Sequence, residues 1–422
     1  MGLDIISVVA LICCIVIGFK KKINVGLICI AGALIFGRLS GFTDKEIISG
    51  FNSNLFITLM GVTFLFAILN INGTIELLAK RIVSFSGNKN WIIPIIVFLV
   101  GYILTAIGPG AIPMLAIIPA FAIPISIARG YHPIMLALIG EFGVFAGRMS
   151  PITPEGILVR DLLSKTEITE NISYITKILV FNQTITGIVC AVFTFIFYKG
   201  YKVNIEKNHE KEKILFNKKQ KISLLGLMIV VILVIFFKYN VGLISFAMGA
   251  ILLCLGVAEE KKAISSIPWG VLIMISGVGT LMKLVITVGG IELVSVILSK
   301  FMNSYTVSSV MGTTAGIMSW FSSGLGVVFP TLIPTVSSIA KLVGNESLAL
   351  EIASLIIIGG TFAGLSPFST AGGLIVATAM AESKEKNIEN QEEKLFKELI
   401  LWSVIPIVIF VTMSLIGFYS II

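Results

Sequence analysis

Long apolar segments recur along the whole chain and limit what it can fold into more than any other feature. Early examples cover residues 4–19, 23–39, 55–71 and 172–198. Segments of this kind approach the ~20 residues that a helix needs to cross about 30 Å of hydrocarbon. Only 13% of the 422 residues are charged, and the mean hydropathy is +1.02. We therefore expect an all-α polytopic membrane protein, because in lipid a helix satisfies its own backbone hydrogen bonds.

Residue usage excludes several classes of function. The net charge of +8 does not indicate nucleic-acid binding, because the basic residues are spread over polar loops without interleaved aromatic residues. An intramembrane hydrolase would need a histidine base inside a transmembrane segment. The two histidines, His132 and His209, stand at a segment edge and in a polar stretch. We therefore expect no enzyme activity, no catalytic residue and no organic cofactor.

The sequence repeats itself at one fixed offset. Residues 24–28 (NVGLI) return at 240–244, and 240 minus 24 is 216. The Ser-Pro pair at 150–151 returns at 366–367, again 216 residues on. A lysine-rich polar stretch separates the two copies and is too charged to enter lipid. We predict a first repeat over residues 1–198, a cytoplasmic linker over 199–221 and a second repeat over 222–422.

Each repeat contains the same predicted elements in the same order. Five segments cross the membrane in each repeat if its hairpin is re-entrant, and seven cross it if the hairpin spans. Either count is odd, so the second repeat starts from the opposite side of the membrane. Inverted-topology repeats of this kind are typical of secondary transporters, whose sites lie where the repeats meet. The predicted ranges are 4–71 and 222–286 for scaffold helices, 91–128 and 305–344 for hairpins, and 131–166 and 347–382 for broken helices.

Lysine and arginine predict the orientation. The side that carries the linker and residues 384–397 collects about twice as many basic residues as the other side. Basic loops stay on the cytoplasmic side of a membrane. We therefore expect both termini outside, in the cytoplasmic membrane of a prokaryote.

Proline and glycine interrupt the two hairpin segments. The first interruption is Gly108-Pro109-Gly110, and its copy in the second repeat is Gly324-Leu325-Gly326. Proline removes a backbone donor, and glycine frees the chain to turn. Such backbone survives at membrane depth only inside protein or around a water-filled cavity. We predict that both segments are re-entrant hairpins with their tips at these glycines.

The broken helices contain a second pair of interruptions, at residues 150–156 (SPITPEG) and 366–372 (SPFSTAG). The free N–H groups of a half-helix attract anions, and its free carbonyls coordinate cations. Four such breaks, two in each repeat, could surround one transport site. The expected substrate-binding residues are Gly108, Gly110, Arg148, Thr153, Ser323, Gly324, Gly326, Ser369 and Thr370. The expected cation-binding residues, where Na⁺ could bind, are Thr105, Ser150, Ser322 and Ser366.

Three ionisable residues lie deep in the apolar sequence of the first repeat. Arg148 and Glu155 flank the first broken-helix motif, and Glu141 precedes Arg148 on a similar helix face. Arg148 could hold a substrate carboxylate with its fork of donors. It could equally be neutralised by Glu141 or by Glu155. The sequence leaves these alternatives open.

Paired hairpins and paired broken helices resemble the ion transporter superfamily. The segments INVGLICIAGALIFGRLSG, LFITLMGVTFLFAILNINGTIELLAKRIV and AIGPGAIPMLA are similar to the dicarboxylate and malonate carriers of the MatC type. A more distant resemblance is to the divalent anion/sodium symporters. These resemblances imply a homodimer and a mobile transport domain of hairpins and broken helices that moves like an elevator.

The resemblance also places residues at the site and shows one departure. Thr153-Pro154 matches the Thr-Pro of the sodium symporters, and Ser369 takes the threonine position in the second repeat. The symporters have Ser-Asn-Thr at each hairpin tip, whereas this chain has glycine-rich tips. Side-chain ligands for sodium are therefore missing at the tips.

Together these observations predict a symporter for a small dicarboxylate such as malonate or succinate, with Na⁺ as the coupling ion. The alternatives are a proton-coupled carrier, in which Glu141 or Glu155 would carry the proton, and a transporter of another organic or inorganic anion. An ion channel is the alternative from a different class. The expected partners are the carboxylate substrate, membrane lipid and a second copy of the chain, with no nucleic acid.

Overall fold

The computed structural model describes the chain apart from residues 1, 22, 85–90, 167, 169–170, 204–214, 238, 301, 322, 368, 382–387 and 421–422. The described residues form α-helices and short 3-10 or π turns, with no β-strand among them. In this part of the chain, seven helices are long and apolar enough to cross a membrane. The predicted all-α polytopic membrane protein is confirmed.

The first half of the chain contains ten α-helices within the described residues. They are α1 (Leu3–Lys21), α2 (Val25–Leu39), α3 (Asp44–Ile48), α4 (Ser53–Ile71), α5 (Thr74–Ser84), α6 (Ile92–Ala106), α7 (Ala111–Ala128), α8 (Met135–Gly147), α9 (Pro154–Leu163) and α10 (Ile172–Phe197).

The second half presents the same order of elements. They are α11 (Lys218–Phe237), α12 (Val241–Cys254), α13 (Glu260–Ser265), α14 (Trp269–Thr287), α15 (Gly290–Ser299), α16 (Val307–Phe321), the π turn η2 (Gly324–Val328), α17 (Phe329–Leu332), η3 (Ile333–Thr335), α18 (Val336–Leu342), α19 (Ala349–Phe362), α20 (Thr370–Ala381) and α21 (Ile388–Leu415). The helix that follows the hairpin tip is continuous in the first half, as α7, and divided into α17, η3 and α18 in the second.

Asparagine caps begin equivalent helices in the two halves. The Asn24 side chain accepts a hydrogen bond from the Gly26 N–H at 2.9 Å, and Asn240 accepts one from the Leu243 N–H at 3.0 Å. Each bond satisfies one of the free N–H groups at the start of a helix. The repeated Asn-Val-Gly-Leu-Ile segment is therefore a helix start, and it fixes where α2 and α12 begin.

The two halves interlock through glycines at two equivalent crossings. α2 crosses α14 where a Cβ on Gly277 would lie 2.1 Å from the Gly26 carbonyl oxygen. α12 crosses α4 where a Cβ on Gly61 would lie 2.2 Å from the Gly242 carbonyl oxygen. Both pairs are 216 residues apart, since 242 minus 26 and 277 minus 61 give that number. A helix of each half therefore packs backbone to backbone on a helix of the other half.

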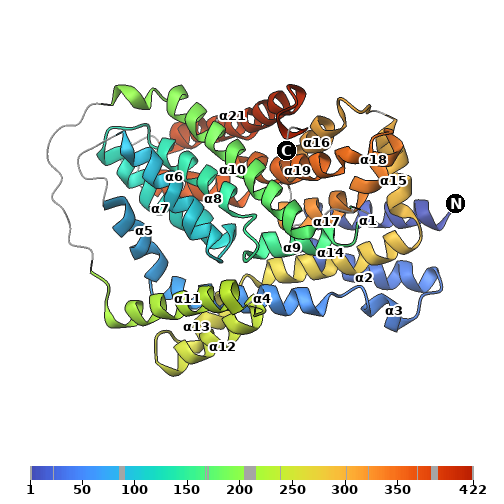
Figure 1. The fold of residues 1–422 in the computed structure, drawn as a ribbon, viewed down its shortest axis with the longest axis horizontal. Helices are drawn as coiled ribbons and strands as arrows, with labels where there is room; N and C mark the ends of the chain where they lie inside the picture. The colour runs from blue at the N-terminus through green and yellow to red at the C-terminus, as the bar shows by residue number, and fades with distance from the viewer. Residues whose placement is uncertain are drawn as a thin grey trace.

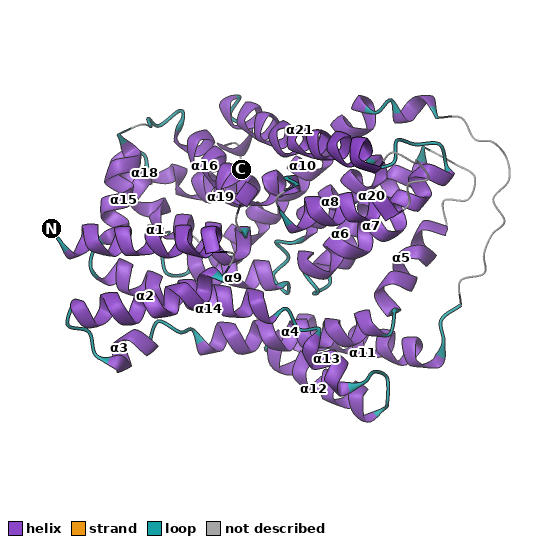
Figure 2. Cartoon of the chain, turned by 180° about the vertical axis from the view of Figure 1, so that it is seen from behind, coloured by secondary structure: helices purple, strands orange, loops and turns teal. Residues whose placement is uncertain are grey.

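The hairpins and broken helices pack in a second group of helices. α8 contacts α6 and α10, and α19 contacts α16 and α21, which also contact each other. α7 packs against α20, and α9 contacts η3, so these elements also cross between the halves. Figure 1 shows α6, α7 and α8 together on the left, and Figure 2 shows α20 beside them from behind. This arrangement brings the breaks of both halves to the middle of the molecule.

Candidate functional site

The first helix break is closed by the hydroxyl of Thr153. This hydroxyl donates to the carbonyl oxygens of Arg148 at 2.5 Å and Ser150 at 2.7 Å, and it accepts from the Gly156 N–H at 3.1 Å. Thr153 thereby caps α9, and Pro154 stands at its first turn, where the missing N–H costs nothing. The side chain is fully buried, and its hydrogen-bonding capacity goes to its own chain.

The second helix break is built in the same way. The Ser369 hydroxyl donates to the carbonyl oxygens of Gly364 at 2.6 Å and Ser366 at 2.7 Å, and it accepts from the Gly372 N–H at 3.2 Å. Each of these four residues stands 216 positions after its counterpart in the first half, as 369 minus 153 shows. The repeated Ser-Pro phrase therefore encodes one capping motif twice.

The glycine of each phrase is required by close packing inside that motif. A Cβ on Gly156 would lie 2.0 Å from the Ser150 carbonyl oxygen, and a Cβ on Gly372 would lie 2.2 Å from the Ser366 carbonyl oxygen. A larger residue would push the first turn of the helix away from the break. The sequence pattern and the geometry agree at this position in both halves.

The two hairpin tips have different conformations. Gly108 and Gly110 have positive φ angles of 141° and 72°, which favour glycine, and α7 starts directly after them. At the second tip, the Ser323 hydroxyl accepts a hydrogen bond from the Gly326 N–H at 3.1 Å and starts the π turn η2. The interruption is conserved between the halves, but the turn that makes it is not.

A buried ion pair joins the first break to the first hairpin tip. The Glu155 Oε1 atom lies 3.5 Å from Arg148 Nη2 and accepts a hydrogen bond from the Ala111 N–H at 2.9 Å. Glu155 is fully buried, and Arg148 is 8% exposed. Glu141 is also fully buried, but its carboxyl oxygens have no hydrogen-bond partner among the described residues. Of the two acids that could neutralise Arg148, the structure pairs it with Glu155.

The Arg148 guanidinium is not saturated by these contacts. Its Nη1 atom lies 3.5 Å from the Thr361 hydroxyl, and its Nε atom has no hydrogen-bond partner in the described part of the chain. The guanidinium carbon also lies 5.9 Å from the centre of the Phe329 ring, within the range of a cation–π contact. Both hydrogen bonds are long, so the donors of Arg148 remain able to bind an anion.

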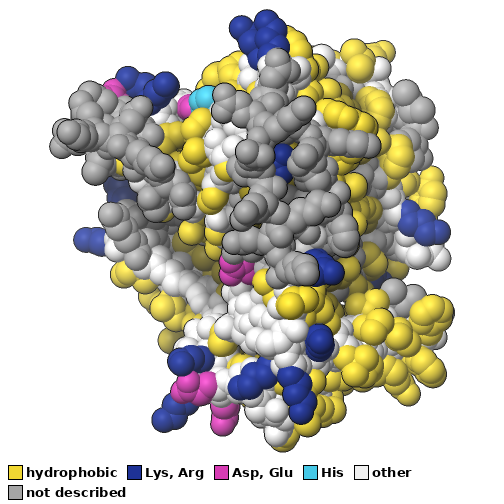
Figure 3. Space-filling model, turned by 90° about the vertical axis from the view of Figure 1, so that its left-hand side faces the viewer, with side chains coloured by type: hydrophobic (Ala, Val, Ile, Leu, Met, Phe, Trp, Pro, Cys, Tyr) yellow, Lys and Arg dark blue, Asp and Glu magenta, His cyan; other side chains and the backbone are white. Residues whose placement is uncertain are grey.

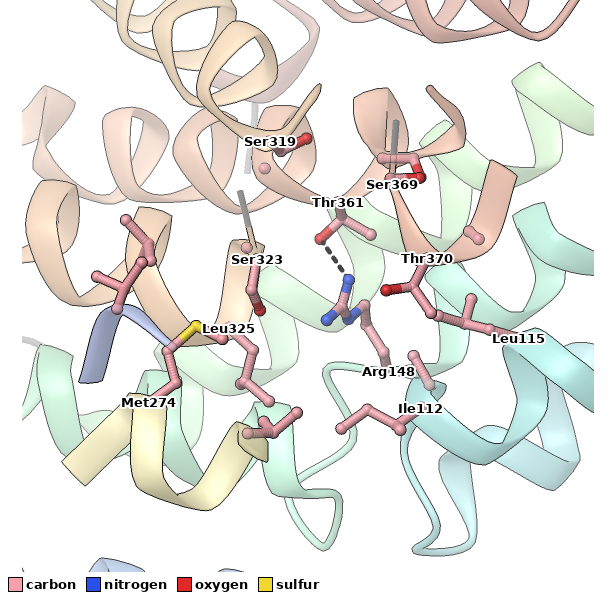
Figure 4. Close-up of a pocket in the computed structure, with 18 of the residues that line it drawn as sticks. Ile112, Leu115, Arg148, Met274, Ser319, Ser323, Leu325, Thr361, Ser369 and Thr370 are labelled. Atoms are coloured by element: carbon pink, nitrogen blue, oxygen red, sulfur yellow. Dashed lines mark hydrogen bonds between the residues drawn. The ribbon is translucent and has the colours of Figure 1, made fainter. Parts of the chain in front are cut away.

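A cavity of about 490 Å³ lies between the two halves, and Arg148 is one of the residues that line it. Figure 4 shows Arg148 pointing into it, with Ser323, Thr361 and Thr370 around the guanidinium. Apolar side chains of both halves form much of the remaining wall. The lining residues are Gly18, Ile23, Asn24, Val25, Ala111, Ile112, Leu115, Phe145, Arg148, Val271, Met274, Ser319, Ser323, Gly324, Leu325, Val327, Gly360, Thr361, Gly364, Ser369, Thr370 and Ala371.

The structure brings five of the nine predicted substrate residues to this cavity. They are Arg148, Ser323, Gly324, Ser369 and Thr370. The other four do not line it and lie directly behind its wall or at a hairpin tip: Gly108, Gly110, Thr153 and Gly326. The Thr153 and Ser369 hydroxyls are bonded to their own backbone, so neither is free to bind a substrate in this conformation.

Three of the predicted cation-binding residues, Thr105, Ser150 and Ser366, are not among the residues that line the cavity. The Thr105 hydroxyl is buried and has no hydrogen-bond partner among the described residues. The carbonyl oxygens of Ser150 and Ser366 accept the capping hydroxyls and also the N–H groups of Thr153 at 3.1 Å and Ser369 at 2.9 Å, so both lone pairs of each oxygen are used. Ser322 lies outside the described residues. Each of the three described positions still has a side-chain hydroxyl oxygen, a neutral donor of the kind that suits Na⁺.

Sequence reasoning missed three polar residues that line the cavity: Asn24, Ser319 and Thr361. Thr361 stands 216 positions after Phe145, and both residues face the cavity. Applying the repeat offset to the helix before the break would therefore have identified it. Asn24 belongs to the repeated helix start, but nothing in the sequence places it at the site.

Residues 1–148 match the family described as the N-terminus of the dicarboxylate carrier protein MatC. The match covers 148 of the 422 residues, so it shows a similarity of the first part of the chain to this family. No curated protein matches the sequence. The matched residues include the first hairpin tip and end at Arg148.

Two solved transporters share the fold. The YdaH transporter of Alcanivorax borkumensis has a TM-score of 0.58 and 10% identity, with 88% of this chain and 87% of that chain covered. MtrF of Neisseria gonorrhoeae, described as illuminating a class of antimetabolite efflux pumps, has a TM-score of 0.59 and 13% identity, with 91% and 84% covered. The family match and this fold indicate a multi-pass membrane transporter and not an enzyme.

Proposed function

We propose that this MatC-type chain is a secondary active symporter for a small dicarboxylate such as malonate or succinate. The observation that carries the proposal is Arg148, a buried and unsaturated guanidinium that points into a cavity between the two halves. A planar fork of donors matches the geometry of a carboxylate. The name of the matched family supports the same substrate class.

A substrate carboxylate would take Arg148 from Glu155. The two side chains are 3.5 Å apart, a distance at which the ion pair is long and open to competition. Hydroxyls of Thr361 and Thr370, which lie beside the guanidinium in Figure 4, would add neutral donors to the same carboxylate. Glu155 would keep its bond to the Ala111 N–H at the start of α7. Substrate binding would thus break the ion pair of Glu155 and leave its contact with the first hairpin tip in place.

The transport cycle follows from the arrangement of the repeats. Five crossings in each repeat place the second repeat upside down, so the two hairpins approach the site from opposite sides. Helices α1, α2, α4, α11, α12 and α14 would form the scaffold of a homodimer. Hairpins and broken helices would move against that scaffold as an elevator. The two glycine crossings, where helices of both halves pack at backbone distance, support a rigid scaffold.

A coupling ion is needed to accumulate the substrate. A dicarboxylate carries about two negative charges at neutral pH, and moving each one against 100 mV costs roughly 2.3 kcal/mol. We favour Na⁺ at Thr105, Ser150, Ser322 and Ser366, because unwound backbone and hydroxyl oxygens occur in both repeats. The alternative is a proton carried by Glu141 or Glu155, which are buried carboxyls of the first half.

The proposed location is the cytoplasmic membrane of a prokaryote, with the linker in the cytoplasm and both termini outside. Figure 3 shows the face on the left of Figure 1, where Lys and Arg side chains are spread around the undescribed residues. Basic residues of the described part at this end include Lys218, Lys219 and Lys221 at the start of α11. Positive charge on one face supports this orientation.

Uptake into proteoliposomes tests the proposed function. The purified chain is reconstituted, and labelled malonate, succinate and longer dicarboxylates are offered with sodium and proton gradients imposed separately. We expect accumulation of at least one dicarboxylate under one of the two gradients, and none in liposomes that contain Arg148→Met. The proposal is wrong if no carboxylate accumulates or binds.

A further inference from the structure

The two halves contribute different groups at equivalent positions of the cavity. Arg148 in the first half corresponds to Gly364 in the second, because 364 minus 148 is 216. Both residues line the cavity. The first half therefore supplies a cation, whereas the second half leaves the equivalent side-chain position empty. Any ligand that fills the cavity meets two unlike ends.

A serine hydroxyl lies next to the empty position. A Cβ on Gly364 would lie 4.0 Å from the Ser319 Oγ atom, which is ordinary contact distance. Ser319 stands in the last turn of α16 and lines the cavity. In Figure 4, Ser319 lies above Thr361 and Arg148 lies below it. Ser319 and Arg148 therefore lie on opposite sides of Thr361 in this view.

The Ser319 hydroxyl has no hydrogen-bond partner among the described residues, although the side chain is only 2% exposed. Serine in a helix commonly donates to the carbonyl four residues earlier, as Thr313 and Thr314 of the same helix do to residues 309 and 310. A buried hydroxyl that does not bond to its helix is costly unless a ligand supplies the partner. Its position at the cavity wall makes the substrate that partner.

Other buried serines also have unbonded hydroxyls, but they do not line the cavity. Ser308, Ser309 and Ser337 also have buried hydroxyls without a partner in the described part of the chain. None of the three lines the cavity. They lie in helices around the site and serve as matched controls for Ser319.

We propose that Ser319 binds the second polar group of the substrate and sets the preference for a dicarboxylate over a monocarboxylate. One carboxylate pairs with Arg148, the short carbon chain lies between the two ends of the substrate inside the cavity, and the far carboxylate accepts a hydrogen bond from Ser319. This inference rests on the proposed function, because it assumes that the cavity binds a carboxylate. The second end carries no charge, so it recognises an acceptor oxygen by hydrogen bonding alone.

The test compares acids that differ only at the far end. Dissociation constants are measured by calorimetry for the purified protein with succinate and butyrate, and with malonate and propionate. We expect wild-type protein to bind each diacid more tightly than its matched monoacid. Ser319→Ala should weaken diacid binding about ten- to a hundredfold, because it removes a hydrogen bond to a charged group. Monoacid binding should stay unchanged, and Ser337→Ala should change neither.

The outcomes distinguish the role of Ser319 from the proposed function itself. Equal effects of Ser319→Ala on diacids and monoacids, or no effect on either, would overturn the role of Ser319 and leave the proposed function intact. Binding of diacids and monoacids with equal affinity by the wild-type protein would overturn it as well. Wild-type protein that binds no acid at all would reject the proposed function itself. If Ser319→Ala does not fold, Ser319→Thr, which keeps the hydroxyl, and Ser319→Cys, which replaces it by a weak donor, make the same comparison.

Discussion

Replacing Arg148 separates its role as a counter-ion from its role in binding. Arg148→Met leaves Glu155 fully buried with its Ala111 hydrogen bond and without a positive partner. For charges 3.5 Å apart, an effective dielectric constant of about 20 gives an interaction of roughly 5 kcal/mol. Breaking a buried ion pair by removing one partner costs about 3 to 5 kcal/mol. We expect a loss of stability of that size.

The double variant Arg148→Met with Glu155→Gln removes both charges. Glutamine keeps an acceptor for the Ala111 N–H, and no unpaired charge stays in the interior, so most of the lost stability should return. For 422 residues, the unfolding entropy of globular proteins converts 4 kcal/mol into a melting shift of about 5 °C. Thermal unfolding in detergent measures this shift in the single and double variants.

Transport should not return with stability. If Arg148 binds the substrate carboxylate, the double variant regains its melting temperature but still lacks the donor fork, and its substrate affinity stays at least tenfold below wild type. Arg148→Lys is the matched control, because it keeps the charge and loses the planar geometry. A double variant that transports like the wild type would refute this reasoning and reduce Arg148 to a counter-ion of Glu155.

Three further predictions concern the linker, the caps and the coupling ion. Single cysteines placed in residues 199–221 should react with an impermeant reagent only from the cytoplasm, and labelling from outside would reverse the proposed orientation. Thr153→Ala and Ser369→Ala should each lower the free energy of unfolding by about 1 kcal/mol through loss of a cap, as measured by thermal unfolding, whereas Thr153→Ser should not. Substrate affinity should rise with sodium at fixed pH. A sodium-independent affinity that weakens as pH rises, and loses this dependence in Glu141→Gln or Glu155→Gln, would instead establish proton coupling.

The sequence predicts those parts of the structure that depend on local chemistry. Apolar length specifies the helices, and proline with glycine specifies the breaks, because each effect acts within a few residues. The repeat offset adds the capping role of Ser369 once Thr153 is understood. The sequence also predicts Arg148 at the site, because a charge deep in apolar sequence needs a partner or a ligand.

Contacts between residues that are far apart in the chain could not be predicted in the same way. Thr361 reaches Arg148 across 213 residues of chain, and Glu155 bonds Ala111 across 44. Such contacts depend on how helices pack, and the sequence offers several acids that could pair with one arginine. Ser319 gave no signal at all, because its importance comes from an unbonded hydroxyl and the missing side chain of Gly364.

Positions that have the same contacts in both halves belong to the architecture, whereas positions that differ between the halves belong to the chemistry of the site. Thr153 and Ser369 cap their helices with the same bonds, and the two glycine crossings have the same close approach. In contrast, Arg148 of the first half corresponds to Gly364 of the second, and Glu155 corresponds to Ala371. A scaffold needs both halves to pack alike, whereas one asymmetric substrate needs different groups at its two ends.

Substitutions at the glycine crossings test whether these contacts hold the two halves together. In Gly277→Ala the new methyl group would lie 2.1 Å from the Gly26 carbonyl oxygen, so α2 and α14 must separate. Overpacking of this kind costs about 1 to 3 kcal/mol. The control is Gly279→Ala in the same helix, where the new atom would lie 3.9 Å from the Gly50 carbonyl oxygen. We expect Gly277→Ala and its counterpart Gly61→Ala to lower the melting temperature in detergent by similar amounts and Gly279→Ala to leave it near the wild-type value. Equal melting temperatures for Gly277→Ala and Gly279→Ala would mean that the crossing does not hold the two halves together.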